Sequence, residues 1–405
     1  MRFVAPLYVR IVRHVGLTIG LAAALGRLSA QVTVVWGGSN GSWNTPANWN
    51  GGSLPGPADL AQVSTGSVSV DSGVSVARLQ LSGGNVGGVA VLTLTGAGST
   101  WSGGNMNGAG TLSIQSGATL AITTATHDFV QRAIVNHGTI TWTGGQMRTG
   151  SGGSITNNGT FIDTASDSLS NAFGGIAGTF SNAGTYNKNA AGTTTISLPF
   201  VNTGTVSVQG GTLSFAGSFT NTGGTLNAAG GNLVFSNALQ LGTGTLSGSG
   251  TVTAPSISTG GLVSPGNSAG QLNLVGNLTL LGASRSLFEL GGATQGSGYD
   301  FLSVSGTAAL GGTLELRFIN SFAAAVQSTD SFTLLAATSR TGSFVNVPTT
   351  GLRIFTTDGL GSFQVNFSDT SVSLSNFVAV PEPSTGALVV VGLAVFFAGA
   401  YCRRR

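Results

Sequence analysis

Apolar and polar residues alternate in short runs along most of this chain, as in Thr-Val-Ser-Val at residues 205–208 and Thr-Leu-Ser-Phe at residues 212–215. An alternation with a period of two is typical of β-strands that have one buried face. The runs are rich in Val, Ile, Leu, Phe and Thr, which favour strands, and the Gly, Ser and Asn between them favour turns. No segment between residues 31 and 380 shows a convincing helical period, so the pattern predicts an all-β body.

A short Gly-Thr-apolar element recurs through the middle of the chain. Its glycines follow one another at steps of 21, 25, 20, 20 and 20 residues: Gly138, Gly159, Gly184, Gly204, Gly224 and Gly244. An asparagine accompanies the first five copies: Asn136, Asn157, Asn182, Asn202 and Asn221. A sustained period of this kind is typical of repeat proteins in which each unit stacks on its neighbours.

The repeat predicts an all-β fold of the parallel β-helix, or solenoid, type, with coils of about 20 residues that each supply two or three short strands. We expect a continuous stack over roughly residues 60–280, with the Gly-Thr elements aligned on one edge. Apolar residues would point inward, and Asn and Gly would form corners where the backbone needs positive φ. An antiparallel sandwich or barrel is the alternative, because turns spaced by about 8–12 residues also fit locally.

The predicted organisation has five parts along the chain. They are a signal peptide at 1–30, an N-terminal cap at 31–60, β-solenoid repeats at 61–283, a C-terminal β cap region at 284–378 and a tail at 379–405. The N-terminal cap contains Trp36, Trp43 and Trp49. We expect these rings to plug the first coil, because clustered Trp is usually buried; a sugar-stacking platform is the alternative.

Composition and charge narrow the function classes. Charged residues make up only 7% of the chain and hydrophobic residues reach 41%, which excludes the charged, apolar-poor class of disordered proteins. Seven of the 15 basic residues lie at the two ends, and residues 31–380 hold eight basic and eleven acidic residues, a net charge of −3. The body therefore lacks the basic surface that nucleic-acid binding needs. The single cysteine, Cys402, excludes a disulfide or a cysteine-based zinc site within the chain.

The N-terminus has the order of a signal peptide. Arg2, Arg10 and Arg13 precede an apolar run of 12 residues, Val15–Gly26, and small residues lie before Gln31. A membrane-spanning helix needs about 20 apolar residues, so we expect a helix that is cleaved rather than a short membrane anchor, which is the alternative.

The C-terminus carries the most specific motif. Pro381-Glu382-Pro383 precedes an apolar run, Gly386–Cys402, and Arg403-Arg404-Arg405 end the sequence. The run has 17 residues, the lower limit for a transmembrane helix of about 17–25 residues, and the arginines would keep that end cytoplasmic. The prolines resist helix and would hold the triplet extended beside the membrane, where a protease or transpeptidase could bind it. An ordinary C-terminal anchor is the alternative interpretation.

This triplet, span and arginine cluster resemble the PEP-CTERM sorting signal of Gram-negative bacteria, over about the last 25 residues. The resemblance implies that a membrane exosortase recognises the tail, cleaves near the triplet and passes the body to the cell surface. The residues carried over are Pro381, Glu382, Pro383, Arg403, Arg404 and Arg405.

Residues 36–345 also resemble autotransporter-type passenger repeats. The segments that carry this likeness are Gly261–Gly270, Leu272–Leu280, Tyr299–Gly306 and Leu310–Leu314. Because only the sorting tail follows them, we do not expect self-export through an outer-membrane barrel.

Residues with catalytic chemistry are few in the body. His127 and Asp128 are adjacent, so on a strand their side chains would point to opposite faces, and we expect a solvated pair without catalytic contact. Asp163 and Asp167 lie four residues apart, and we expect them to be scattered solubilising charges. The nearest basic residues are Arg132, Arg148 and Lys188. We therefore predict no catalytic, cofactor-binding or metal site.

The sequence thus predicts a non-enzymatic, exported structural protein of the cell surface or extracellular matrix of a Gram-negative bacterium, first anchored in the inner membrane as a precursor. Its expected partners are an exosortase-type processing enzyme and the inner membrane, with exopolysaccharide as a further candidate and no nucleic acid. A carbohydrate-binding or carbohydrate-active β-helix is the alternative function.

Overall fold

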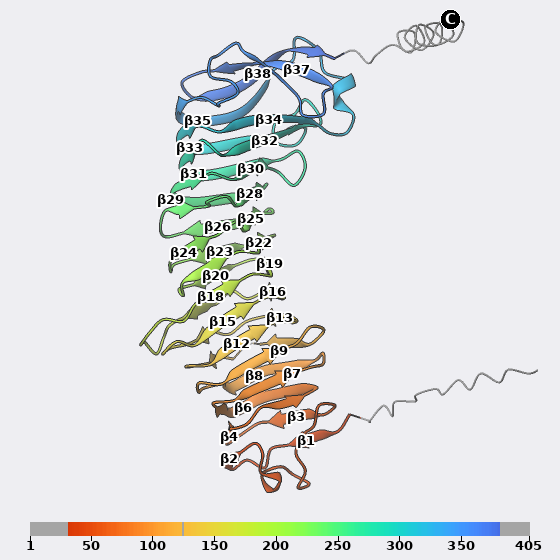
Figure 1. Ribbon diagram of the computed structural model, residues 1–405, viewed down its shortest axis with the longest axis vertical. Helices are drawn as coiled ribbons and strands as arrows, with labels where there is room; N and C mark the ends of the chain where they lie inside the picture. The colour runs from red at the N-terminus through yellow and green to blue at the C-terminus, as the bar shows by residue number, and fades with distance from the viewer. Residues whose placement is uncertain (1–30, 124, 381–405) are drawn as a thin grey trace, which may run out of the picture.

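The computed structural model describes residues 31–123 and 125–380. It is a parallel β-solenoid of about 11 turns with almost no helix, so the predicted all-β solenoid is confirmed. Stacked at about 4.8 Å, 11 turns extend over roughly 50 Å. Figure 1 shows the strands following one another along an elongated rod. The predicted signal helix and C-terminal transmembrane helix lie outside the described residues.

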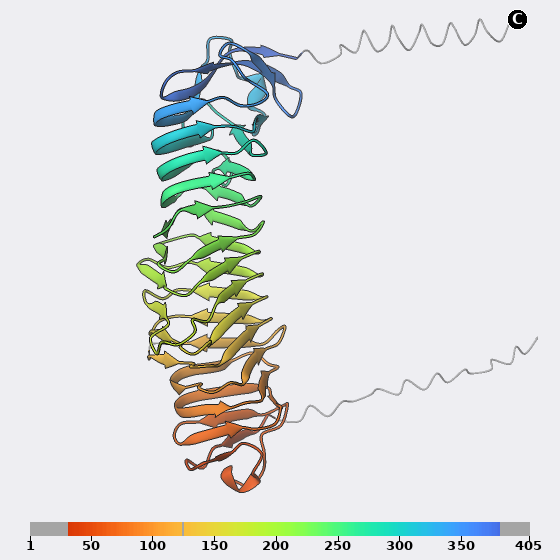
Figure 2. The same ribbon diagram turned by 60° about the vertical axis from the view of Figure 1, so that its left-hand side comes forward.

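Each coil contributes strands to as many as three sheets, and the strands of each sheet stack along the rod (Figure 2). The first sheet contains β1 (Thr33–Val35), β2 (Asn40–Ser42), β3 (Leu60–Val63), β4 (Ser67–Val70), β6 (Arg78–Gly88), β8 (Ser99–Asn105), β10 (Thr119–Ile122), β13 (Thr139–Trp142), β16 (Thr160–Asp163), β19 (Thr185–Lys188), β22 (Thr205–Val208), β25 (Thr225–Ala228), β28 (Thr245–Gly248), β30 (Leu262–Pro265), β32 (Arg285–Leu290) and β34 (Thr313–Phe318). The second sheet contains β11 (His127–Asp128), β14 (Met147–Arg148), β17 (Ser168–Ser170), β20 (Thr193–Ile196), β23 (Thr212–Phe215), β26 (Asn232–Phe235), β27 (Leu239–Gln240), β29 (Thr251–Thr259), β31 (Gln271–Leu280), β33 (Phe301–Leu310), β35 (Phe332–Gly342), β36 (Arg353–Phe355), β37 (Gly361–Phe367) and β38 (Ser371–Ala379). The third sheet contains β5 (Val74–Val76), β7 (Val91–Leu94), β9 (Thr111–Ile114), β12 (Ala133–Asn136), β15 (Ser154–Asn157), β18 (Phe180–Asn182), β21 (Phe200–Asn202) and β24 (Phe219–Asn221). Two single-turn 3-10 helices, η1 (Pro46–Asn48) and η2 (Phe322–Ala324), lie in loops.

The Gly-Thr elements lie in register on the first sheet, as predicted. The threonine of each element pairs with that of the next: Thr139, Thr160, Thr185, Thr205, Thr225 and Thr245. Their glycines do not have positive φ, so the expected reason for glycine is wrong at these positions. A Cβ at Gly159 would collide with the carbonyl oxygen of Gly138 in the coil below, and one at Gly184 with that of Gly159. Close contact between coils excludes a side chain there.

The core lies inside the stack, where alternate side chains of all three sheets meet. Aromatic rings stack along the third sheet: the centroids of Phe180 and Phe200 are 4.7 Å apart, and those of Phe200 and Phe219 are 5.5 Å apart. Phe215 and Phe235, from the second sheet, stack at 5.1 Å. Because each ring contacts its copy in the next coil, the stack buries apolar surface that no single coil could cover.

Near the C-terminus the coils change. Strands β29, β31, β33 and β35 have 9 to 11 residues, and β29 pairs with both β26 and β27. Parallel pairing continues past residue 283, where the sequence placed the end of the repeats, as far as Gly342. The paired residues Thr245, Leu262, Arg285 and Thr313 are 17, 23 and 28 residues apart, so no constant step marks these coils in the sequence.

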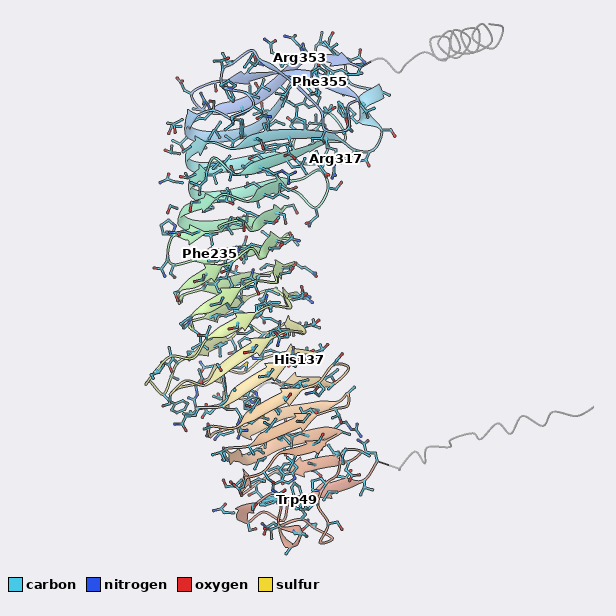
Figure 3. The ribbon with its side chains drawn as sticks, viewed as in Figure 1. Trp49, His137, Phe235, Arg317, Arg353 and Phe355 are labelled. Carbon is cyan, nitrogen blue, oxygen red and sulfur yellow. The ribbon has the colours of Figure 1, made fainter. Side chains whose placement is uncertain are left out.

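Both ends of the stack are closed. Figure 3 shows Trp49 at the N-terminal end of the rod. Its ring packs edge-on against Trp36 and Trp43, with centroids 5.0 and 4.8 Å apart. The three rings are at most 2% exposed, so they plug the first coil as predicted and present no face to a sugar. At the other end, β35 pairs antiparallel with β38, and β37 and β36 complete a small antiparallel cap.

Candidate functional site

The predicted sorting residues Pro381, Glu382, Pro383 and Arg403–Arg405 lie outside the described residues. The described chain ends at Val380, whose amide donates a hydrogen bond to the Leu360 carbonyl beside the antiparallel cap. Figure 1 places this cap at the opposite end of the rod from β2 and the tryptophan plug. The predicted sorting residues therefore follow, in the sequence, the end of the rod that carries the antiparallel cap. Within residues 31–123 and 125–380, no helix is both long and apolar enough to cross a membrane.

His127 and Asp128 point to opposite faces of β11, as predicted. The Asp128 carboxylate accepts two hydrogen bonds from the Arg148 guanidinium, at 2.8 and 3.0 Å. His127 is fully buried, so the expectation of a solvated residue is wrong. Its Nε2 lies 2.7 Å from the Thr123 carbonyl oxygen, and its ring packs edge-on against Trp101 at 4.7 Å. Burial lowers the pKa of His127, which favours the neutral imidazole.

Asp163 and Lys188 form a buried charge pair, which corrects the expectation of scattered solubilising charge. The parallel register places the end of β16 beside the end of β19, and both side chains are 0% exposed. The Lys188 Nζ lies 3.8 Å from the Asp163 Oδ1 and donates a hydrogen bond of 2.6 Å to the Ala165 carbonyl. The Tyr186 hydroxyl donates to Oδ2 at 2.8 Å, and the Thr194 hydroxyl donates to Oδ1 at 3.1 Å.

This cluster is a closed network inside the core. Burial raises the pKa of Asp163, and the Lys188 charge and the hydroxyl donors oppose that rise. Tyr186 and Thr194 are also buried, so no external molecule reaches the carboxylate. Asp167 is not part of the network, because its Oδ2 accepts a hydrogen bond of 2.8 Å from the Gly145 amide in the coil below. The two carboxylates of the sequence pair therefore have separate roles in holding coils together.

An asparagine ladder is the largest polar feature that the sequence analysis missed. The amide Nδ2 of each asparagine donates to the Oδ1 of the next, at 2.7, 2.7, 2.8 and 2.8 Å, along Asn136, Asn157, Asn182, Asn202 and Asn221. The side chains are buried at the corner between the third and first sheets. The sequence predicts corners with positive φ at these asparagines, but none has positive φ. The signal available in the sequence was their spacing, because four of them lie two residues before the element's glycine and Asn221 lies two residues before Gly223.

A hollow of about 310 Å³ lies where the third sheet ends at β24. Its lining consists of Phe219, Thr220, Asn221, Ala238, Gln240 and Gly242. The hollow exists because β27, in the coil above, pairs with β29 and not with β24. It combines a half-buried aromatic ring with an exposed hydroxyl and an exposed amide, a set suited to stacking and hydrogen bonding with a sugar.

Within the described part of the chain, no group of three or more His, Cys, Asp or Glu side chains is placed to hold a metal ion. No protein-family model matches the sequence, and no curated protein matches it at the level of significance applied.

Proposed function

We propose that this protein is an exported structural rod, delivered to the cell surface or extracellular matrix of a Gram-negative bacterium by its C-terminal tail. A cleaved signal helix at 1–30 would direct export, and a transmembrane helix over Gly386–Cys402 would hold the precursor in the inner membrane. An exosortase-type enzyme would then act near Pro381-Glu382-Pro383. The protein would have no enzymatic activity of its own.

One observation carries the proposal: the ordered sorting motif follows directly on a capped end of a rod. Because the arginines Arg403–Arg405 disfavour passage of the last residues across the membrane, the precursor would pause with its body outside. The tail joins at the antiparallel cap, so the tryptophan plug would point away from the membrane by roughly the 50 Å of the stack. The charged groups inside the rod bind coils to one another, which agrees with a structural role.

The decisive experiment replaces Pro381, Glu382 and Pro383 by alanine in the full-length precursor. We expect the variant to remain membrane-inserted and to accumulate at full length in the inner membrane, because the span and the arginines are intact. The matched control is Ser384→Ala together with Thr385→Ala, which changes neighbouring residues and leaves the triplet. Cell fractionation and immunoblotting of the precursor and mature forms provide the measurement.

A second variant, truncated after Val380, should be released as a folded body into the periplasm. If the alanine variant is processed and displayed like the wild type, the sorting proposal fails and an ordinary membrane anchor accounts for the tail.

Binding of carbohydrate is a second candidate function, favoured by the hollow beside Phe219 and Gln240. Affinity electrophoresis in gels that contain different polysaccharides would test it. We expect retardation that is lost in Gln240→Ala and kept in Gln327→Ala, a control on another exposed glutamine. Retardation that is equal in both variants, or absent in all, would exclude the hollow as a sugar site.

A further inference from the structure

The outer face of the antiparallel cap carries four exposed apolar side chains, which we call the cap face. They are Phe355, Leu360, Val378 and Val380, with 66, 44, 53 and 42% of their surfaces exposed. Soluble surfaces commonly expose single apolar residues, whereas a group on one small sheet indicates a contact with another apolar phase. Figure 3 shows Phe355 on this cap, close to Arg353.

The pairing register explains why these side chains share a face. Ser362 of β37 pairs with Phe355 of β36 on one side and with Val378 of β38 on the other. Residues directly opposite one another in a sheet point to the same side. Leu360 and Val380 lie two positions further along their segments and are joined by a backbone hydrogen bond of 3.0 Å, so the alternation brings them to that side too.

The opposite side of the same sheet packs against the solenoid core. Ile354, Phe363 and Phe377 point inward and are at most 7% exposed, and Phe363 and Phe377 each lie within 6 Å of Phe318 at their ring centroids. The cap therefore has one face that closes the solenoid core and an opposite face on which the four apolar side chains stay exposed, while Ser362 between them is covered. The outward apolar residues are not required to close the stack.

The sequence places this face beside the predicted membrane span. Only residues 381–385 separate Val380 from the apolar run that begins at Gly386. Five extended residues reach at most about 18 Å, and the headgroup layer on one side of a bilayer is roughly 5–8 Å thick. If the tail spans the membrane as proposed above, the cap cannot move far from the lipid surface. Arg353 lies on the same side as Phe355 and donates hydrogen bonds to the Ser362 carbonyl and hydroxyl, at 2.9 and 3.2 Å.

We propose that the cap face lies on the outer surface of the phospholipid bilayer, with the Phe355 ring among the headgroups and Arg353 near lipid phosphates. This inference rests on the proposed transmembrane tail. Phe355 and the valines would bury apolar surface at the interface, and the guanidinium would contact phosphate oxygens. The contact would orient the rod while the precursor awaits processing. A second copy of the chain, paired along the outer edge of β36, is the competing occupant.

The test uses full-length precursor with Cys402→Ser, reconstituted into phosphatidylethanolamine–phosphatidylglycerol vesicles. An environment-sensitive fluorophore is attached through Phe355→Cys, and the control carries it through Ile176→Cys, a position that is 82% exposed near the middle of the rod. We expect the label at position 355 to shift to shorter emission wavelengths and to be quenched severalfold more strongly by spin-labelled lipid than the control label. Adding Val378→Ser with Val380→Ser should reduce the shift.

The outcomes separate the two proposals. If the precursor fails to float with the vesicles, the transmembrane tail and the proposed function are wrong. If it floats and the label at 355 stays as exposed to water as the control, the cap face does not contact lipid and this inference is overturned. A label that is shielded from both water and lipid, in a precursor that cross-links as a dimer through β36, would show a second copy on the face and would also overturn it.

Discussion

The middle of the rod and its C-terminal part turn corners in different ways. In residues 133–228, each coil consists of three short strands, and the corner between the third and first sheets is lined by the asparagine ladder. In residues 251–342, one long strand spans two faces, and β-bulges occur between Thr253 and Ser256 and between Val304 and Thr307. The ladder ends at Asn221, the last residue of β24, and the third sheet ends at the same strand.

The difference shows which groups satisfy the hydrogen-bonding requirement of the backbone at a corner. When a strand stops at a sharp corner, inward-facing backbone carbonyls need donors, and the asparagines supply them: Asn182 donates to the Thr205 carbonyl at 3.0 Å. When a strand bends through a bulge, pairing with the neighbouring coil resumes within a few residues, so backbone amides and carbonyls bond to those of that coil. Short strands therefore depend on buried side-chain amides, and long strands do not.

The largest effect that distinguishes the regions should come from their ion pairs. We expect Lys188→Met to lower the free energy of unfolding by about 3–5 kcal/mol, because it leaves the Asp163 carboxylate buried without its counter-charge. Arg285→Met, which removes the exposed partner of Glu315 in the C-terminal region, should cost less than about 1 kcal/mol. Urea unfolding followed by circular dichroism measures both.

Restoring neutrality provides the control for that prediction. Asp163→Leu combined with Lys188→Met should recover part of the loss, because the uncompensated charge is gone. Equal losses for Lys188→Met and Arg285→Met would show that the buried pair is no more important than a surface pair.

Breaking the ladder should have the next largest effect. Asn182→Leu removes three donated hydrogen bonds and the acceptor for Asn157, and should cost more than about 2 kcal/mol. The matched change in the long-strand region is Thr259→Val. Thr259 occupies the corresponding position two residues before Gly261, where its hydroxyl accepts a single hydrogen bond of 3.0 Å from the Gly261 amide. Its loss should cost about 1 kcal/mol, and a larger cost than at Asn182 would contradict the comparison.

A buried acid of the long-strand region should make the stability of the protein depend on pH. Asp300, in the long-strand region, accepts hydrogen bonds from the Gly270 and Glu289 amides, and burial raises its pKa to about 7. A folded-state pKa above the ordinary value of 3.8 means that the folded protein binds the proton more tightly. The stability from Asp300 is therefore present at low pH and lost as the pH rises towards about 7.

Asp300→Asn tests this dependence, because the amide cannot titrate. Between about pH 4 and pH 7, the wild type should lose stability relative to the variant, as measured by thermal unfolding midpoints across the range. Parallel profiles for the two proteins would assign the pH dependence to other groups, such as Asp163, whose pKa burial also raises.

The smallest effect is expected at the loop that interrupts the regular step. Residues 171–178 project between β17 and β18, in the coil where the step is 25 residues, and Ile176 is 82% exposed. Ile176→Ser should change the free energy of unfolding by no more than about 0.5 kcal/mol. A substantially larger loss in urea unfolding would mean that the loop contributes to the coil contacts around it.

The sequence predicted the features that repeat and missed those that depend on contacts with the neighbouring coil. The period of the Gly-Thr element specified the solenoid and its register, because each threonine pairs with the next copy. It did not reveal that Asp163 and Lys188 meet, since these residues are 25 apart and become neighbours only where a coil is longer than the usual 20 residues. The glycines were recognised, but the reason for them, contact with the carbonyl below, requires the stacked backbone.

The C-terminal coils were hidden for a related reason. Their steps vary and their corners are bulges, which have no fixed residue signature, so the sequence predicts repeats only as far as residue 283. The cap was anticipated as a β region, but the antiparallel pairing of β36, β37 and β38 that creates its apolar face could not be derived from alternation alone.

The stacked glycines of the Gly-Thr elements, from Gly138 to Gly244, also constrain how the length of the rod can change in evolution. Each of these glycines faces a backbone carbonyl of the preceding coil, and at Gly224 and Gly244 the amide of a ladder asparagine also fills the space, so every coil imposes the same steric requirement on the next. A gene duplication that inserts one whole coil would again place a glycine against the carbonyl of the coil below, whereas an insertion of part of a coil would place a side chain there. The length of the rod can therefore be inherited and altered in whole steps of about 4.8 Å, with both closed ends left unchanged.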